Sequence, residues 1–112
     1  MKEMVLDSAD VAARAWMPIA DWPGVDAKTL WEDARTGSYG GLMRLAAGSS
    51  VPAHTHRYSV HHVWVIEGEC TMLGRKLGPG SYCFSPAGIA HSVDPSQQGC
   101  TVFYLYLRAD MD

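Results

Sequence analysis

The sequence lacks the features that mark several common functional classes. It has no run of Lys or Arg and its formal net charge is −3, so it offers no electrostatic footprint for a nucleic acid or an anionic membrane. No apolar stretch approaches the roughly 18 residues of a membrane span, and the N-terminus has no apolar signal-peptide segment. We therefore expect neither a membrane nor a nucleic-acid partner.

Cysteine is scarce, and the common catalytic and phosphate-binding patterns are missing. Cys70, Cys83 and Cys100 are odd in number and form no CxxC pair, which favours neither a disulfide framework nor a zinc ribbon. We interpret them as reduced, mostly buried thiols of a cytoplasmic protein. No GxxxxGK or GxGxxG run occurs, and no Ser-His-Asp set or Cys-His nucleophile pair is evident. Most of the remaining information lies in the histidines.

The length and the turn signals indicate a single all-β domain. The chain has 112 residues, 47% of them hydrophobic, which is enough for one core and too little for two ordinary domains. From Gly37 onward, short β-forming runs alternate with Gly and Pro turn signals, a pattern typical of a barrel or sandwich. Residues 8–15 favour a helical turn or two with Ser8 as the cap, although a strand or an arm is also compatible. We expect residues 1–35 to be an N-terminal arm on the barrel or on a partner chain, and residues 36–112 to form the barrel.

Two expected strands, at residues 61–66 and 101–107, are apolar on both faces. Side chains alternate along a strand, so a solitary barrel should show polar residues to water on its outer side. The outer faces must therefore be covered by the segment with Trp16, Trp22 and Trp31 or by a second copy of the chain. Because a symmetric dimer is the commonest oligomer, we expect a homodimer.

Two glycine-bounded segments carry histidines at fixed spacings. The first is Gly48-Ser-Ser-Val-Pro-Ala-His54-Thr-His56-Arg-Tyr-Ser-Val-His61-His62-Val-Trp-Val-Ile-Glu67-Gly68, and the second is Gly80-Ser-Tyr-Cys-Phe-Ser-Pro86-Ala-Gly88-Ile-Ala-His91-Ser-Val-Asp-Pro95. This pattern resembles the two motifs of the cupin superfamily (RmlC-like proteins), with His61 where the family usually has Glu and Pro95 where it usually has Asn. The resemblance covers roughly residues 40 to 107. It implies a single-domain cupin β-barrel, that is, a double-stranded β-helix or jelly roll.

The same residues predict a metal site. His54 and His56 are two positions apart, so their imidazoles project to one face of a strand. His61 enters from the neighbouring strand, and His91 joins if the turn at residues 86–88 returns the chain. We predict that His54, His56, His61 and His91 bind one divalent transition metal ion, with Fe, Mn, Ni, Cu and Zn all left open. By alternation, His62 should point to the outer face.

Four imidazoles in place of three and a carboxylate would have two chemical consequences. They leave the ion its full double positive charge, which favours an anionic bidentate ligand such as the enolate of a diketone. Because ligand histidines must be neutral, we expect metal loss below about pH 6.

Other residues near the motifs are weaker candidates for the site. Tyr58 follows His56 in a loop and is our candidate catalytic group, as a hydrogen-bond donor or proton carrier, although a plain loop tyrosine also explains it. Three single arginines could bind a substrate carboxylate, but surface solvation is the simpler interpretation; they are Arg44, Arg57 and Arg75. Pocket lining and core packing explain another set equally well, namely Met43, Phe84 and Tyr104.

The resemblance extends to function. Small cupins similar to this one include dioxygenases that cleave diketones and acetophenones, which implies a metal-dependent dioxygenase or related oxidoreductase acting on a small oxygenated substrate. Two alternatives stay open: an O₂-independent metal isomerase, lyase or decarboxylase, and a non-enzymatic small-molecule-binding module. Fold alone does not decide among these functions. Oxygen dependence of turnover would separate the dioxygenase from the O₂-independent enzyme.

Overall fold

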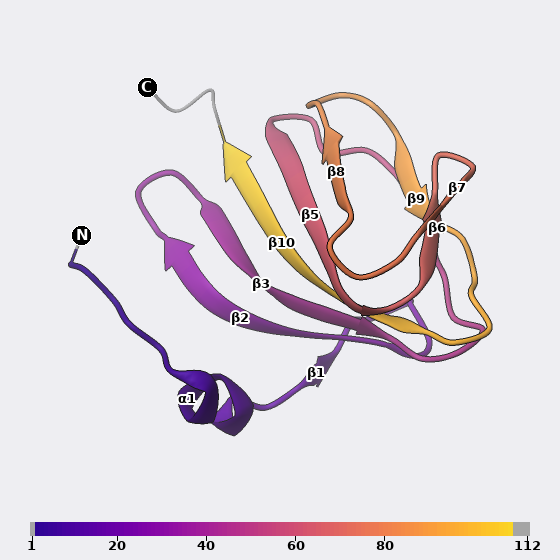
Figure 1. Cartoon of the computed structure of the whole chain (residues 1–112). Helices are drawn as coiled ribbons and strands as arrows, with labels where there is room; N and C mark the ends of the chain where they lie inside the picture. Colours follow the sequence, from indigo (N-terminus) through magenta and orange to yellow (C-terminus); the bar gives the residue numbers. More distant parts are fainter. Residues whose placement is uncertain (1, 109–112) are drawn as a thin grey trace.

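The structure, a computed structural model, describes residues 2–108, and its regular secondary structure is strands apart from one short helix (Figure 1). Its elements are α1 (Ser8–Ala13), β1 (Met17–Pro18), β2 (Val25–Asp33), β3 (Ser38–Leu45), β4 (Val51–His54), β5 (Ser59–Gly68), β6 (Cys70–Met72), β7 (Arg75–Leu77), β8 (Tyr82–Ser85), β9 (His91–Val93) and β10 (Cys100–Arg108). Six strands form one antiparallel sheet in the order β1-β2-β3-β10-β5-β8, and β4-β9 and β6-β7 form two smaller sheets. Figure 1 shows the long strands as one curved sheet with the shorter strands closing over one end. The all-β prediction is confirmed.

Part of the segment expected to be an arm belongs to the main sheet. Residues 25–33 form β2, which pairs with β3 along its whole length, as in Ala27↔Met43 and Glu32↔Tyr39. The boundary expected between residues 35 and 36 thus falls inside the β2–β3 hairpin. The sequence pattern did not reveal this strand because Lys28 interrupts the alternation of apolar and polar residues. Lys28 is only 5% exposed, and an apolar residue is usual at such a buried position.

The short helix α1 and its N-cap lie one residue earlier than expected from the sequence. Asp7, rather than Ser8, is the N-cap: its side chain accepts a hydrogen bond from the backbone N–H of Asp10 at 2.8 Å, and the Asp10 carboxylate accepts one from the backbone N–H of Asp7 at 3.1 Å. This reciprocal pair satisfies two backbone donors of the first turn.

Within residues 2–108, no helix has the length and apolar character to cross a membrane.

Trp16 fastens the arm to the outer face of β2 and β3. Its ring lies under two cations, with Lys28 Nζ at 4.5 Å and the Arg44 guanidinium carbon at 4.3 Å from the centroid. Lys28 Nζ also donates a hydrogen bond to the carbonyl of Val11 at 3.1 Å. The arm therefore supplies the partners that a buried lysine requires.

The core lies between the curved sheet and the small sheets. On β10 every second side chain is buried, namely Val102, Tyr104 and Tyr106, and on β5 His61 and Val65 are buried. The strands predicted at residues 61–66 and 101–107 are present with the expected alternation. The inward face of this sheet is therefore the wall against which the candidate site is built.

Candidate metal centre

Strand pairing explains why histidines far apart in the chain meet. His54 ends β4, His91 begins β9, and the two residues are direct partners in the antiparallel ladder. The turn at residues 86–88 is fixed to the loop that carries His56, because the Gly88 N–H donates to the His56 carbonyl at 2.8 Å. Gly88 has φ +79°, a conformation that glycine adopts without steric cost. The turn thus does what the sequence predicted and returns the chain to the site.

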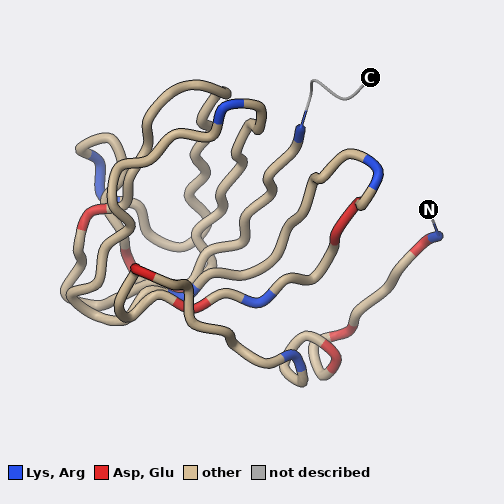
Figure 2. Tube along the Cα trace, turned by 180° about the vertical axis from the view of Figure 1, so that it is seen from behind, with Lys and Arg blue, Asp and Glu red and all other residues tan. Residues whose placement is uncertain are grey.

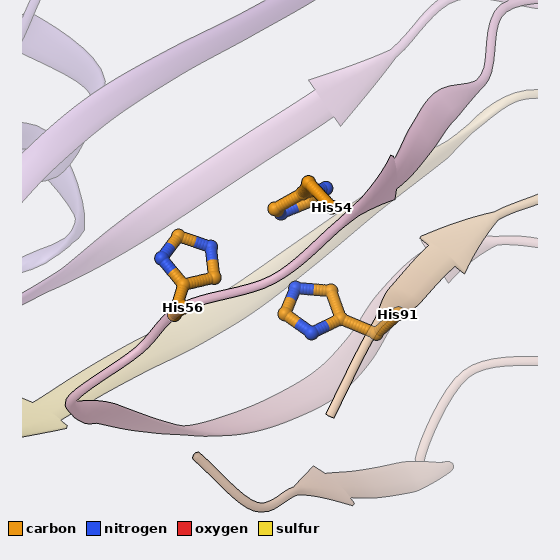
Figure 3. A group of neighbouring side chains, drawn as sticks. All are labelled: His54, His56 and His91. Atoms are coloured by element: carbon orange, nitrogen blue, oxygen red, sulfur yellow. The ribbon is translucent and has the colours of Figure 1, made fainter. Parts of the chain in front are cut away.

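Three imidazoles face one another at this point (Figure 3). The ring nitrogens that His54, His56 and His91 offer all lie within 4.8 Å of one another. The ring centroids are 4.9 Å apart for His54 and His56, 4.3 Å for His54 and His91, and 5.3 Å for His56 and His91. Imidazole nitrogens from separate elements that converge in this way are the usual donor set of a transition-metal site.

The hydrogen bonding of these rings fits a cation. His54 Nδ1 lies 2.7 Å from the Pro52 carbonyl, which can only accept, so this nitrogen carries the proton and Nε2 keeps its lone pair. Within the described part of the chain, the buried atoms His54 Nε2, His56 Nε2 and His91 Nδ1 have no hydrogen-bond partner. One such buried group costs about 1–3 kcal/mol. A metal ion would satisfy all three together.

His61 lies against the group of three without being one of them. Its ring centroid is 4.1 Å from that of His56 and 4.4 Å from that of His91, and it stacks on Tyr106 at 3.6 Å. The side chain is only 3% exposed, and its Nε2 likewise has no partner among the described residues. The sequence grouped all four histidines; in the structure the ring nitrogens of His54, His56 and His91 lie within 4.8 Å of one another, and the His61 ring lies beside them, stacked on Tyr106.

Tyr106 is the site residue that sequence reasoning missed. It is the register partner of His61 across β10 and β5, so both side chains point to the same face. Burial raises its pKa, with Tyr39 and Tyr104 adding to the shift. The alternation of β10 was the available signal, but only the pairing of β10 with β5 shows that Tyr106 meets a histidine.

His62 points away from the site, as alternation predicted. Its Nδ1 is 2.7 Å from the Tyr82 hydroxyl, and its ring lies 6.0 Å from that of Trp64 on the outer face. This position makes His62 a natural control for experiments on the other histidines.

Burial sets the protonation of the inward histidines. Desolvation lowers the pKa of His91 to about 4 and the pKa of His61 still further, and neighbouring histidines add to both shifts. The pKa of His56 is also lowered, first by desolvation and then by His54. At neutral pH these three rings are therefore unprotonated, and protons compete only weakly for the nitrogens that a metal needs. Metal loss should accordingly begin at a lower pH than the value of about 6 expected from unshifted histidines.

The lowered pKa values predict that the metal-free protein loses stability in acid. In the unfolded chain these histidines take up protons near pH 6.5, whereas folded His91 stays neutral until about pH 4. The unfolded state thus binds more protons between these values, and the free energy of unfolding should fall by about 1.4 kcal/mol per pH unit for each such histidine. Urea unfolding of metal-free protein at pH 7, 6 and 5 measures this slope. Equal or greater stability at pH 5 would contradict it, and a His91→Gln variant should show a shallower slope.

A small cavity opens from the histidines into the core. It has a volume of about 50 Å³ and is lined by His54, His61 and His91 together with apolar side chains and Tyr104 and Tyr106. Of the possible lining residues, Met43 and Tyr104 do line it, whereas Phe84 is 47% exposed elsewhere. The described lining includes no carboxylate. The cavity suits a small ligand with an apolar body and one polar end directed at the histidines.

Tyr58 does not line this cavity. Its side chain is 47% exposed, and the guanidinium carbons of Arg57 and Arg108 lie 5.2 Å and 5.4 Å from its ring centroid. The structure therefore places the candidate catalytic tyrosine in the loop between β4 and β5, outside the cavity lining.

Comparisons with known proteins agree with this architecture. The family model of the ChrR cupin-like domain matches residues 4–109. Similar solved structures include an RmlC-like cupin from Ralstonia eutropha (21% identity, TM-score 0.79, 96% of this chain and 70% of that one) and a predicted oxalate decarboxylase from Thermotoga maritima (20%, 0.78, 94% and 99%). A third is an acetylacetone dioxygenase from Acinetobacter johnsonii (19%, 0.75, 96% and 74%). No curated protein matches the sequence.

Proposed function

The chain belongs to the family of ChrR cupin-like domains, and we propose that it is a metal-dependent dioxygenase or related oxidoreductase acting on a small oxygenated organic substrate. The observation that carries the proposal is the convergence of three buried imidazole nitrogens that have no hydrogen-bond partner among the described residues. Two of these histidines, His54 and His91, also line the small apolar cavity. The similarity to the acetylacetone dioxygenase is a similarity of fold. The proposal therefore also relies on the histidine nitrogens, which are suitable ligands for a transition metal.

The chain's own residues would bind, orient and shield such a substrate. His54, His56 and His91 would hold a divalent ion, with Fe, Mn, Ni, Cu and Zn as the candidates, and we propose that His61 assists from its place on Tyr106. When bound, a redox-active ion supplies Lewis acidity and electron exchange with O₂. The apolar wall excludes water from the substrate. Tyr104 and Tyr106 have pKa values raised by burial, so their hydroxyls stay protonated as hydrogen-bond donors.

An O₂-independent lyase or decarboxylase is the second candidate, favoured only by the fold of the Thermotoga protein. Such chemistry usually needs a carboxylate or another base beside the metal, and the described cavity lining has no carboxylate. A non-enzymatic binding module would use the same cavity without turnover.

Oxygen uptake tests the proposal. Protein loaded separately with Fe(II), Mn(II), Ni(II), Cu(II) or Zn(II) is mixed with acetylacetone in an oxygen electrode. We expect uptake with at least one redox-active ion and none with Zn(II), which has no redox chemistry. His91→Ala should abolish uptake, whereas His62→Ala should retain it. Substrate loss at an equal rate without O₂ would instead support the lyase, and tight binding without turnover would support the binding module.

We also propose that the chain forms a homodimer through the outer face of β5 and β8. Four large side chains on this face are between 36% and 50% exposed: Trp64, Ile66, Tyr82 and Phe84. The patch carries no charged residue, and its rings contact one another, with Trp64 and Tyr82 at 5.1 Å. An uncharged aromatic face of this kind suits contact with an identical face.

Sedimentation equilibrium across the micromolar range tests the dimer. The wild type should sediment as a dimer, and Ile66→Glu should shift it to a monomer by burying a charge in the interface. Leu73→Glu, at an exposed position in the β6–β7 turn, is the matched control and should leave the dimer intact. A monomeric wild type at every concentration would refute the proposal.

A further inference from the structure

The tip of the β6–β7 hairpin carries a leucine in a backbone conformation that suits other residues better. Two residues, Leu73 and Gly74, join the strands between the paired Met72 and Arg75. Both have positive φ, +51° for Leu73 and +75° for Gly74, as in a type I′ turn. Such a turn favours Asn, Asp or Gly at its first position, because bulky apolar residues are disfavoured in the left-handed region. The turn itself therefore does not account for the leucine.

Burial does not account for Leu73 either. Its side chain is 78% exposed, so packing in the core does not offset the unfavourable conformation. The residues that follow it are also exposed, and two of them, Arg75 and Lys76, are cations. Figure 2 shows this basic stretch in blue, on the side of the molecule away from α1. A single leucine beside two charges is unlike the contiguous apolar patches that bind protein partners.

Leu73 does have a place in the cavity that adjoins the histidines. It lines this cavity together with Met72, the residue before it. Met72 is only 9% exposed, and the other described lining residues are buried or half-buried as well. Leu73 alone among them is exposed. It therefore marks the mouth, where the cavity meets solvent.

The hairpin is fixed to the strand that carries His91. The backbone N–H of Asp94 donates to the Thr71 carbonyl at 2.9 Å, and these two residues form a β-bridge between the hairpin and the end of β9. Asp94 is three residues beyond His91, which begins β9. Figure 1 shows β6 and β7 beside β9. The position of Leu73 relative to the metal centre is thus set by the fold.

The size of the cavity gives the mouth a role in substrate binding. A volume of about 50 Å³ has room for only about three to five water-sized groups. The chelating end of a small diketone would fill most of this space, so a larger substituent has to leave through the mouth beside Leu73. An apolar side chain at that point favours an alkyl or aryl substituent, because both groups are then removed from water.

We propose that Leu73 is a specificity-determining residue whose side chain covers an apolar substituent of the substrate at the cavity mouth. The substrate class is then an oxygen-chelating ketone or diketone that carries an alkyl or aryl group. This inference rests on the proposed function, because it assumes that the histidine centre binds the oxygens of the same molecule. The unfavourable conformation of Leu73 is offset only when the substituent is bound, a case of stability given up for function.

The experiment compares acetylacetone with nonane-2,4-dione, which has the same chelating end and four more methylene groups. Binding is measured by calorimetry without O₂ to Zn(II)-loaded protein, so turnover does not interfere. Each fully buried methylene group strengthens binding about fourfold, so partial burial at the mouth should still give the wild type at least about tenfold higher affinity for the nonanedione. Leu73→Asn should remove most of that preference and leave the affinity for acetylacetone unchanged.

Two further variants and a stability measurement sharpen the outcome. Val5→Asn removes a side chain of matching exposure, 79%, from the N-terminal segment and should keep the preference. Leu73→Met retains an apolar side chain at the mouth and should keep most of it. Leu73→Asn should also raise the thermal midpoint of the metal-free protein by about 2–6 °C, since asparagine tolerates positive φ. This increase distinguishes a loss of specificity from a loss of folding.

The possible failures are distinguishable. Equal affinity of the wild type for the two diketones, or a preference that survives Leu73→Asn, would overturn the inference about Leu73 and leave the proposed function standing. A thermal midpoint of Leu73→Asn below that of the wild type would contradict the conformational cost on which the inference depends. Binding of neither diketone by the loaded wild type would overturn both the inference and the proposed function.

Discussion

Replacing His91 with alanine should weaken metal binding by at least about a hundredfold, the largest effect expected from any single change at the site. The substitution removes one of three converging donors and leaves the ion with two imidazoles, for which a water ligand is a poor substitute. A competition titration of metal-free protein with Zn(II) and a chromophoric chelator measures the affinity. His62→Ala is the matched control, because His62 is hydrogen-bonded to Tyr82 on the outer face. This variant should leave the metal affinity unchanged.

The same titration separates the roles of His61 and His91. Since His61 lies outside the group of three and is stacked on Tyr106, His61→Ala should lose less affinity than His91→Ala. Equal losses would restore the four-ligand site that the spacing predicted. Unchanged affinity in His91→Ala would remove the basis of the proposed function.

Replacing Gly41 with alanine should destabilise the fold by about 3 kcal/mol or more. Gly41 sits where β3 pairs with β2 beside an irregularity in the register at Thr29. A Cβ built there would lie 2.1 Å from the Lys28 carbonyl oxygen and 3.0 Å from the Thr29 Cα. Both obstacles are backbone atoms, which cannot rotate away as a side chain can, so the strands must separate locally. A fall in the thermal midpoint of at least about 10 °C is the expected measurement.

Gly78→Ala is the control for this change. No heavy atom lies within 4 Å of a Cβ built at Gly78, so the chemical change is the same without the steric conflict. Its midpoint should stay within a few degrees of the wild type. If Gly41→Ala were equally stable, the close approach of β2 and β3 would be wrong.

The sequence was sufficient for the fold class and for the meeting of the histidines because both depend on local periodicity and on fixed turns. Alternation placed His61 inward and His62 outward, and the turn at residues 86–88 correctly implied that His91 returns to His54. These relations need no knowledge of which strand lies beside which.

Features that depend on strand order could not be predicted in this way. The stacking of His61 on Tyr106 follows from the pairing of β5 with β10, and β10 comes from the far end of the chain. The strand β2 was hidden because the partners of Lys28, Trp16 and Val11, come from the arm. The contact of Arg108 with the Tyr58 ring could not be predicted either, because the two residues lie in distant parts of the chain.

The most direct test of the central claim is X-ray absorption at the zinc edge of the Zn(II)-loaded protein. The account predicts one ion per chain with nitrogen donors at about 2.0–2.1 Å and outer-shell scattering from at least three imidazoles, reduced by one imidazole in His91→Ala. Sulfur ligands, or scattering from fewer than three imidazoles in the wild type, would contradict a centre built on His54, His56 and His91.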